Sequence, residues 1–315
     1  MFTLTDIGQI LWTGLATSTY FVLFSVAFSL VLKVNRIFNF AQAGLMGIAF
    51  YASYWAVQML GLWVWIGVPI GLAITLGATF VLEHYGFRTL RRRKSSAMTF
   101  FIFTLVVAEF VAYVLMLVFG TFPQTLLDQI FWPATMVFGI AVSEWDVPAL
   151  LITAGVLLLL YLGMRFTSQG RFMTAVADNP ELAELYGINK NRVFMWALMA
   201  ATVVAFAGMC LYGTRAQVHP STPLELMLFA VVATILGGIG KVFGAAVAAL
   251  VVNLIQKMSI VAIPSEWEGV LLYGFLFFAI IFFPNGFRLP RRRIRFQTTT
   301  RELAVDKGAG GDAAN

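Results

Sequence analysis

The run IFNFAQAGLMGIAFYASYWAVQMLGLWVWIGVPIGLAITLGATFVL, residues 37–82, contains no Asp, Glu, Lys or Arg. About 20 apolar residues in a helix cross a bilayer, so this run is long enough for two spans. The whole chain of 315 residues is 60% hydrophobic and 11% charged, whereas soluble domains carry about 25% charged residues. The sequence therefore predicts an integral membrane protein.

Outward from this run, further apolar segments predict an all-α, polytopic helical bundle of eight or nine transmembrane segments with interrupted helices. Strand-like alternation is scarce along the chain, which favours helices over a β-barrel. The predicted segments are 7–32, 42–60, 63–83, 97–119, 147–165, 193–213, 225–239, 244–262 and 267–284. The seventh and eighth segments are short, and the break between them is rich in glycine.

Clusters of basic side chains predict the orientation of this bundle. With nine spans, three clusters fall on one side of the membrane, namely Arg88, Arg91, Arg92, Arg93 and Lys94, then Arg165, Arg171, Lys190 and Arg192, and finally Arg288, Arg291, Arg292, Arg293 and Arg295. An excess of Lys and Arg marks the cytoplasmic side. We expect the N-terminus outside, the C-terminus in the cytoplasm, and these clusters in contact with lipid headgroups rather than nucleic acid.

The two ends of the chain carry different signals. Residues 297–315, QTTTRELAVDKGAGGDAAN, are small and polar, so we predict a membrane domain over residues 1–295 and a disordered cytoplasmic tail over residues 296–315. No basic segment and no early cleavage site mark the N-terminus, so the first span is expected to serve as the insertion signal. The single cysteine, Cys210, permits no disulfide within the chain.

The residue types needed for catalysis are scarce. The chain has two histidines, and it lacks HExxH, CxxC, GxSxG and any acidic cluster suited to a metal. The stretch 238–241, GIGK, resembles the end of a phosphate-binding loop, but Ile235 and Val242 replace the glycine and the Ser or Thr that such a loop requires. We expect no catalytic residue, no metal, no cofactor and no ATP site on this chain.

Three features are candidates for a translocation pathway. Two breaks in the hydrophobic pattern, at residues 39–44 and 236–244, supply the candidates Asn39, Gln42, Gly44, Gly237, Gly238 and Gly240. Unwound backbone in a membrane must be buried in protein or line a cavity, and transporters place such breaks at their binding sites. Close helix packing through small residues is the alternative. Glu109, in the middle of the span 97–119, either touches the pathway or bonds to a neighbouring helix.

A polar loop between the fifth and sixth spans, TSQGRFMTAVADNPELAELYGINKN at residues 167–191, predicts a helix at the membrane surface. Asn179 is placed to cap this helix, Pro180 to occupy its first position and Gly187 to end it. A span connection needs only a tight turn, so a capped helix here offers a surface on which a partner protein can push. The spacing of Glu181, Ala183 and Gly187 approximates E-A-A-x-x-x-G.

That spacing resembles the loop by which ABC-transporter permeases dock on their ATPases, and three longer motifs extend the likeness. Residues 34–44 (VNRIFNFAQAG), 177–189 (ADNPELAELYGIN) and 235–245 (ILGGIGKVFGA) resemble, in the same order, segments of the branched-chain amino acid ABC-transporter permease family of the LivH type. The family has histidine at the position of Gln42. The residues FPNGF at 283–287 resemble its closing RP-x-G, and the likeness covers about residues 7–290.

The resemblance implies a multi-pass permease subunit in a bacterial inner membrane. It implies that a periplasmic or lipid-anchored binding protein delivers branched-chain or related amino acids, while two separate ATPase subunits drive alternating access and a homologous second permease completes the pathway. The loop 166–192 would couple to the ATPases through Asp178, Glu181, Ala183 and Gly187. A permease for urea or short amides, and an ion-coupled secondary transporter with Glu109 as its ionisable group, are the alternatives.

Overall fold

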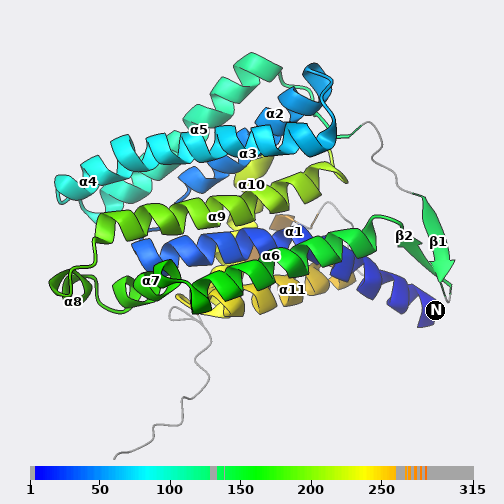
Figure 1. The fold of residues 1–315 in the computed structure, drawn as a ribbon. Helices are drawn as coiled ribbons and strands as arrows, with labels where there is room; N and C mark the ends of the chain where they lie inside the picture. Colours follow the sequence, from blue (N-terminus) through cyan, green and yellow to red (C-terminus); the bar gives the residue numbers. More distant parts are fainter. Residues whose placement is uncertain are drawn as a thin grey trace, which may run out of the picture.

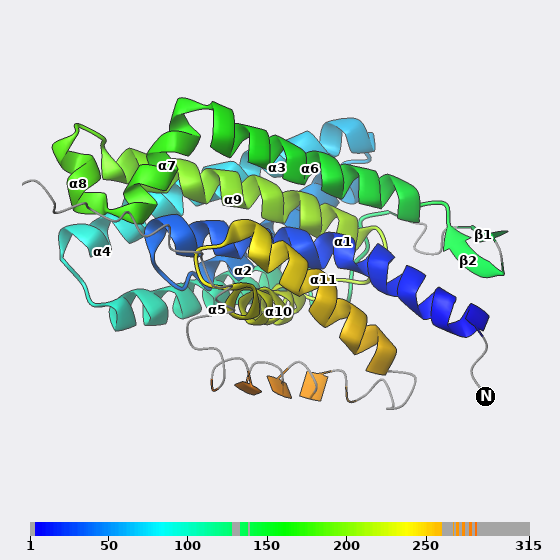
Figure 2. The same cartoon turned by 90° about the horizontal axis from the view of Figure 1, so that it is seen from below.

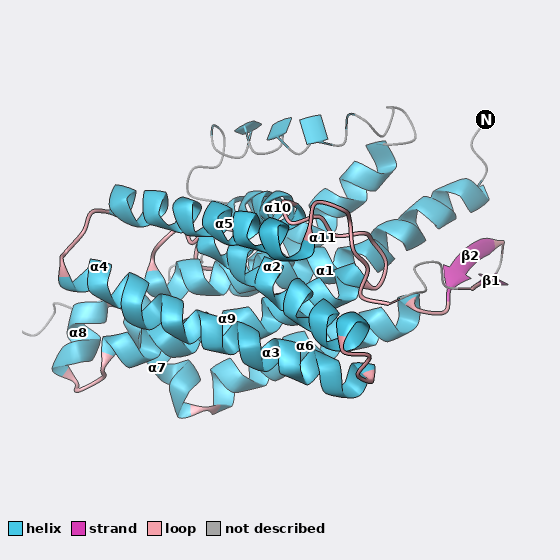
Figure 3. Ribbon diagram, turned by 90° about the horizontal axis from the view of Figure 1, so that it is seen from above, coloured by secondary structure: helices cyan, strands magenta, loops and turns pink. Residues whose placement is uncertain are grey.

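The computed structural model describes residues 4–127, 133–137 and 139–259, and scattered positions between 267 and 281. In these residues the chain forms a bundle of helices with one short hairpin (Figures 1 and 3). The helices are α1 (Leu4–Asn35), α2 (Ala41–Tyr54), α3 (Val64–Val81), α4 (Arg88–Arg92), α5 (Ala97–Phe119), α6 (Asp146–Phe166), α7 (Ser168–Asp178), α8 (Pro180–Leu185), α9 (Lys190–Gly213), α10 (Thr222–Gly237) and α11 (Val242–Ser259). The strands β1 (Ala134–Val137) and β2 (Ile140–Ser143) pair in antiparallel register.

The helices confirm an all-α polytopic membrane protein. Six of them are long and apolar enough to cross a bilayer, and α10 is a shorter apolar helix. Eight of the nine predicted segments coincide with described helices, with ends that differ by a few residues. The segment 267–284, the third basic cluster and the tail 296–315 lie largely or wholly outside the described residues, so the count of eight or nine spans stays a prediction.

The predicted breaks in the hydrophobic pattern are connections between helices. Residues 39–44 cover the end of the link from α1 to α2 and the first turn of α2, which holds Gln42 and Gly44, and residues 236–244 include the turn from α10 to α11. Irregular backbone occurs elsewhere, in the π-helical turns η1 (Trp55–Met59) and η2 (Leu82–Phe87), which follow α2 and α3. A π turn inserts one residue into the helical ladder and leaves the apolar composition unchanged, so hydropathy gives no sign of it.

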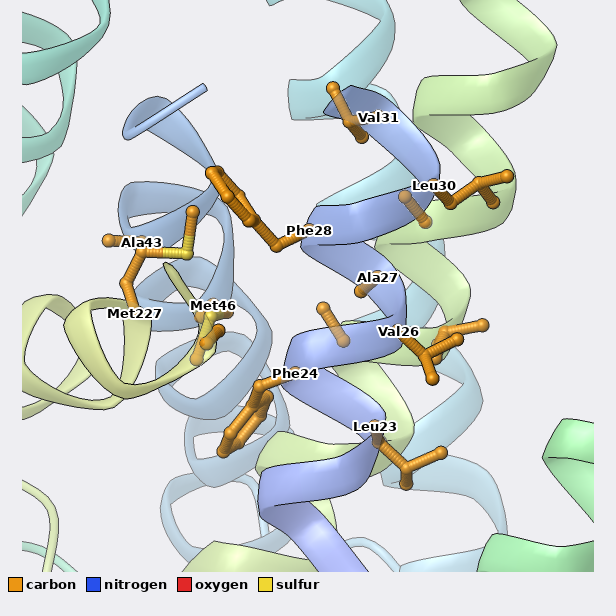
Figure 4. Packing of buried hydrophobic residues seen from close by; sticks show 14 of the residues in the cluster. Leu23, Phe24, Val26, Ala27, Phe28, Leu30, Val31, Ala43, Met46 and Met227 are labelled. Atoms are coloured by element: carbon orange, nitrogen blue, oxygen red, sulfur yellow. The ribbon is translucent and has the colours of Figure 1, made fainter. Parts of the chain in front are cut away.

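Helix α1 forms the centre of the bundle. It contacts α6, α9, α10 and α11, and most of its length is buried. Figure 4 shows Leu23, Phe24 and Phe28 of α1 in a buried cluster with Met46 of α2 and Met227 of α10. Figure 2 shows α9 and α11 on opposite sides of α1. A helix that is apolar on all of its faces is typical of such a central position.

The two ends of the bundle differ. At the end with the N-terminus lies the hairpin (Figure 1), where Asp146 accepts hydrogen bonds from Trp12 and from the backbone of Ser143 and forms a salt bridge with Arg215. At the other end lie α4, α7 and α8, which carry or adjoin the first two basic clusters. The gathering of these two clusters at one end is the arrangement that the predicted topology requires.

Candidate functional site

Helix α8 has the caps that its sequence predicts. The side-chain oxygen of Asn179 accepts from the backbone N–H groups of Glu181 at 3.1 Å and Leu182 at 3.0 Å, and Pro180 follows at the first helical position. Gly187 has a φ of 80°, a value that favours glycine, and its N–H donates to the carbonyl of Glu184 at 3.0 Å. The structure adds α7, an eleven-residue helix that precedes α8.

The outer face of α8 combines apolar and acidic side chains. Ala183 is 4% exposed and anchors the helix, whereas Leu185 and Tyr186 are 84% and 80% exposed. Asp178 and Glu181 are also exposed. Large apolar side chains that stand free at the end of a bundle, surrounded by polar ones, are typical of a protein-binding surface. Three of the four predicted coupling residues, Asp178, Glu181 and Gly187, therefore lie on an accessible surface, and Ala183 holds that surface to the bundle.

A cavity of about 440 Å³ brings the three resemblance motifs together at this end of the bundle. Arg36 and Phe38 come from the first motif, Ala177 and Asp178 from the second, and Ile239 and Gly240 from the third. The guanidinium of Arg36 crosses this junction and donates to the carbonyls of Ala177 at 2.8 Å and Asp178 at 3.0 Å. The surface that carries α8 is thereby bonded directly to the link between α1 and α2.

Glu109 and Gly44, two of the predicted pathway residues, lie beside a second cavity. Both line a small cavity of about 40 Å³ between α2, α5 and the residues that lead into α10. Glu109 is exposed on the surface of this chain, and within the described residues its carboxylate has no hydrogen bond and no ion pair. A bond to a neighbouring helix of the same chain is thus absent among those residues. Gly44 permits close approach of α5, because a β-carbon there would lie 3.2 Å from Val111 Cβ.

Asn39 and Gln42 lie in the interior. Their side chains are 0% and 1% exposed, and neither amide has a hydrogen-bond partner among the described protein atoms. Buried amides without a partner cost about 1–3 kcal/mol each, so packing alone gives no reason for these residue types. Their place in a pathway stays a prediction.

The glycines between α10 and α11 have evident structural roles. A β-carbon on Gly237 would lie 2.4 Å from the backbone of Gly244, so the two helices touch backbone to backbone there. Gly238 and Gly240 have φ values of 95° and 86°, which a tight turn requires. The close contact at Gly237 and the positive φ at Gly238 and Gly240 account for glycine at all three positions. A role of these glycines in the pathway stays a prediction.

Sequence reasoning missed Arg36 as a site residue. Its two acceptors lie 141 and 142 residues further along the chain, and no local spacing announces such a bond. The described residues contain no group of three or more His, Cys, Asp or Glu side chains that could hold a metal ion.

Comparison with known proteins identifies the family. The model of the family described as "Branched-chain amino acid transport system / permease component" matches residues 10–280. The chain is 23% identical over 293 residues to the high-affinity branched-chain amino acid transport system permease protein LivH of Escherichia coli, covering 88% of this chain and 94% of LivH.

Two further relatives give the range of the similarity. BraD of Pseudomonas aeruginosa, also a high-affinity branched-chain amino acid transport system permease protein, is 21% identical over 88% of this chain and 94% of BraD. The xylose transport system permease protein XylH of Haemophilus influenzae is 32% identical, but over only 42% of this chain and 37% of XylH. With the family model matched across most of the helical bundle, the chain belongs to the permease components of branched-chain amino acid transport systems.

Proposed function

We propose that this chain is a membrane-spanning subunit of an ABC importer that moves branched-chain or related amino acids into the cell across a bacterial inner membrane. A binding protein outside delivers the substrate, two ATPase subunits bind on the cytoplasmic side, and a homologous second permease completes the pathway. The observation that carries the proposal is the capped helix α8 with its exposed Leu185 and Tyr186, at the end of the bundle where two basic clusters gather.

The geometry supports a mechanism of alternating access. When the ATPases close on ATP, they displace α8 relative to the rest of the bundle. Ala183 transmits this displacement to the helices it packs on, because it is the buried residue of α8. Arg36 transmits it to the link between α1 and α2 through its two bonds to the end of α7. Helix α2 carries Gly44 and contacts α5, the helix of Glu109, so a tilt of α2 alters the small cavity that those residues share.

Purification with its native partners tests the class of transporter. The chain, extracted from its host in a gentle detergent, is expected to bring down two ATPase subunits and a sibling permease, identified by mass spectrometry. Ligand titration of the associated binding protein then gives the substrate, and tight binding of xylose or urea rather than a branched-chain amino acid would replace the substrate proposed here. A chain that purifies alone and transports alone in liposomes overturns the proposal.

Substitutions on α8 test the coupling role. Gly187→Trp introduces a side chain at a positive φ, and Glu181→Lys reverses a charge on the exposed face. Both variants are expected to reach the membrane in normal amount and to lose transport. Normal substrate-stimulated ATPase activity in both would exclude α8 as the coupling element.

Glu109 is the specific observation in favour of an ion-coupled transporter, because ionisable groups halfway along a span commonly mark ion pathways and proton relays. Inhibitors separate the two classes. Uptake that survives vanadate, an inhibitor of ABC ATPases, but is lost on addition of a protonophore would favour the ion-coupled class.

A further inference from the structure

An apolar groove lies on the outside of the bundle between α6 and α9. It has a volume of about 540 Å³, and its lining includes Leu159 and Gly163 of α6, Met199 and Val203 of α9, and Leu76 of α3. Its lining is almost wholly apolar, and Leu159 and Val203 are exposed in this chain. An apolar side chain on the flank of a membrane bundle faces hydrocarbon, so the groove is a place for hydrocarbon to enter rather than water.

The groove continues into a second, more polar cavity of about 290 Å³ at the end of the bundle that carries α8. Gln169 of α7 and Trp196 of α9 line both cavities. Beyond them, Asn189 and Arg192 line the second cavity. Tryptophan with one apolar and one polar side is enriched where hydrocarbon meets headgroups. The change from apolar to polar lining therefore marks the level of the membrane interface.

The charge at this junction has one sign. Arg192 is the charged residue in the lining of the two cavities, and neither lining contains Asp or Glu. Arg192 is exposed, and among the described salt bridges none involves it, whereas nearby Lys190 is paired with Glu184 at 2.6 Å. Arg192 also borders a third cavity with Glu83, but the carboxylate of Glu83 is paired with Arg91.

We propose that the groove between α6 and α9 binds one phospholipid with an anionic headgroup. One acyl chain lies along Leu159, Gly163 and Val203, Trp196 marks the glycerol level, and the phosphate is bound by Arg192 with Gln169 and Asn189 as neutral hydrogen-bonding groups. Basic pockets between helices on the cytoplasmic side suit such headgroups, and a guanidinium binds phosphate through paired N–H donors.

The proposed site touches the coupling segment. Tyr186, Gly187 and Ile188, which end α8 and lead to α9, form part of the wall of the headgroup cavity. This consequence rests on the proposed role of α8, whereas the lipid site itself stands on the two cavities and on Arg192. A bound lipid would brace the segment that joins α8 to α9.

Lipid retention tests the site. The full chain with its co-purifying subunits is placed in nanodiscs of equal parts phosphatidylglycerol and phosphatidylcholine, and native mass spectrometry counts the lipids that stay bound to it. The natural sequence is expected to retain phosphatidylglycerol in excess. Arg192→Ala should reduce the ratio of phosphatidylglycerol to phosphatidylcholine by about fivefold, the order expected for one basic residue at a membrane surface.

A matched pair of glycines tests the acyl groove. A β-carbon at Gly163 or at Gly155 meets no atom within 4 Å, and both residues lie in α6, but Gly163 lines the groove and Gly155 does not. Gly163→Phe should abolish retention of both lipids, and Gly155→Phe should leave retention unchanged. Arg93→Ala, at the same end of the bundle and outside both cavities, is the control for charge.

Unchanged retention in Arg192→Ala or in Gly163→Phe overturns the proposal. It is also overturned if Gly163→Phe leaves lipid bound but releases a co-purified subunit, because the groove would then be a protein contact.

Discussion

At the scale of the residue, Arg36 is the clearest link between the surface of α8 and the core. Its backbone has a φ of 55°, in the left-handed region that side chains rarely adopt. That conformation ends α1 and sends the guanidinium to two carbonyls at the end of α7. The positive charge of the guanidinium strengthens both hydrogen bonds, so each is stronger than a hydrogen bond between neutral groups.

We predict that Arg36→Ala lowers uptake by about tenfold while leaving membrane assembly intact, since a hydrogen bond to a charged group contributes about 1.5–3 kcal/mol and solvent exposure reduces the contribution of the two at Arg36. Uptake in cells, normalised to the amount of permease in the membrane, measures the effect. Lys33→Ala is the control, because Lys33 lines the same cavity and has no described bond to α7. Equal uptake in the two variants would contradict a transmitting role for Arg36.

Glu109 gives a second prediction at this scale. If its carboxylate lies on the pathway, Glu109→Gln removes the charge at nearly constant volume and should reduce uptake by at least about tenfold at normal expression, because an intramembrane charge is retained for function. Glu144→Gln is the control. It removes a carboxylate at the hairpin end of the bundle and should leave uptake unchanged. Intact uptake in Glu109→Gln would assign this residue to packing between subunits.

The residues that sequence reasoning recognised are those whose partners are close in the chain. Asn179 bonds to groups two and three residues ahead, and Gly187 to one three residues behind. Such relations are visible as spacing. The partners of Arg36 are distant, and the exposure of Glu109 depends on which face of α5 the other helices leave open, so neither was visible before the fold was known.

At the scale of the element, α8 is too short to be stable by itself, because isolated helices shorter than about 12 residues are marginal in water. Its cap is therefore expected to matter more than the cap of a long span. Asn179→Ala should cost about 1 kcal/mol of local stability and lower substrate-stimulated ATPase activity in the complex.

Ser96→Ala is the matched control for this prediction. Ser96 caps the 23-residue helix α5 through the N–H of Thr99 in the same manner, but α5 is also held by its contacts with α2. ATPase activity that falls equally in both variants would show that the effect is not specific to α8.

The packing of α10 on α11 gives a prediction about stability. Gly237→Leu forces a side chain against the backbone of Gly244, and overpacking of this kind costs about 1–3 kcal/mol or more. We expect a lower melting temperature in detergent and a smaller fraction of monodisperse protein. Gly155→Leu, which meets open space, should melt like the natural sequence. A stable Gly237→Leu variant would mean that the two helices separate readily.

The membrane-crossing helices were predictable from length and hydropathy, but α7 and the hairpin were not. Strands β1 and β2 have four residues each, and their fixed position depends on Gln9 of α1, whose amide exchanges hydrogen bonds with the backbone of Ala141 at 2.7 and 3.2 Å. The Gln9 side chain, 132 residues away in sequence, thus makes the pair of hydrogen bonds that a neighbouring strand would otherwise make. Patterns within the segment 134–143 carry no trace of it.

At the scale of the whole molecule, the predicted orientation can be measured directly. In a Cys210→Ser background, Thr135→Cys places a thiol on β1 and Arg93→Cys places one at the opposite end, after α4. A membrane-impermeant maleimide is expected to label Thr135→Cys in intact cells and Arg93→Cys only after lysis, because basic residues stay in the cytoplasm. The reverse labelling would invert the topology and remove α8 from the reach of cytoplasmic ATPases.

The arrangement of the whole bundle was less predictable than its parts. Charge-free length predicts spans one by one, yet it gives no reason for α1, rather than another apolar helix, to be central. That position follows from contacts with α9, α10 and α11, all from the last half of the chain, such as the bond from Asn253 to the Gly14 carbonyl at 2.7 Å.

The central position of α1 has a consequence for biogenesis. This helix is synthesised before α9, α10 and α11, and at about 5–20 residues per second the chain from its end to the end of α11 takes roughly 10–45 s to synthesise. The hydroxyls of Ser18, Thr19 and Ser25 bond to carbonyls of α1 itself, so the helix enters lipid with those groups already satisfied. The nascent permease therefore holds its future core as an outer surface for most of its synthesis, and a chaperone or insertase that covers α1 during this interval would guard it against wrong pairing.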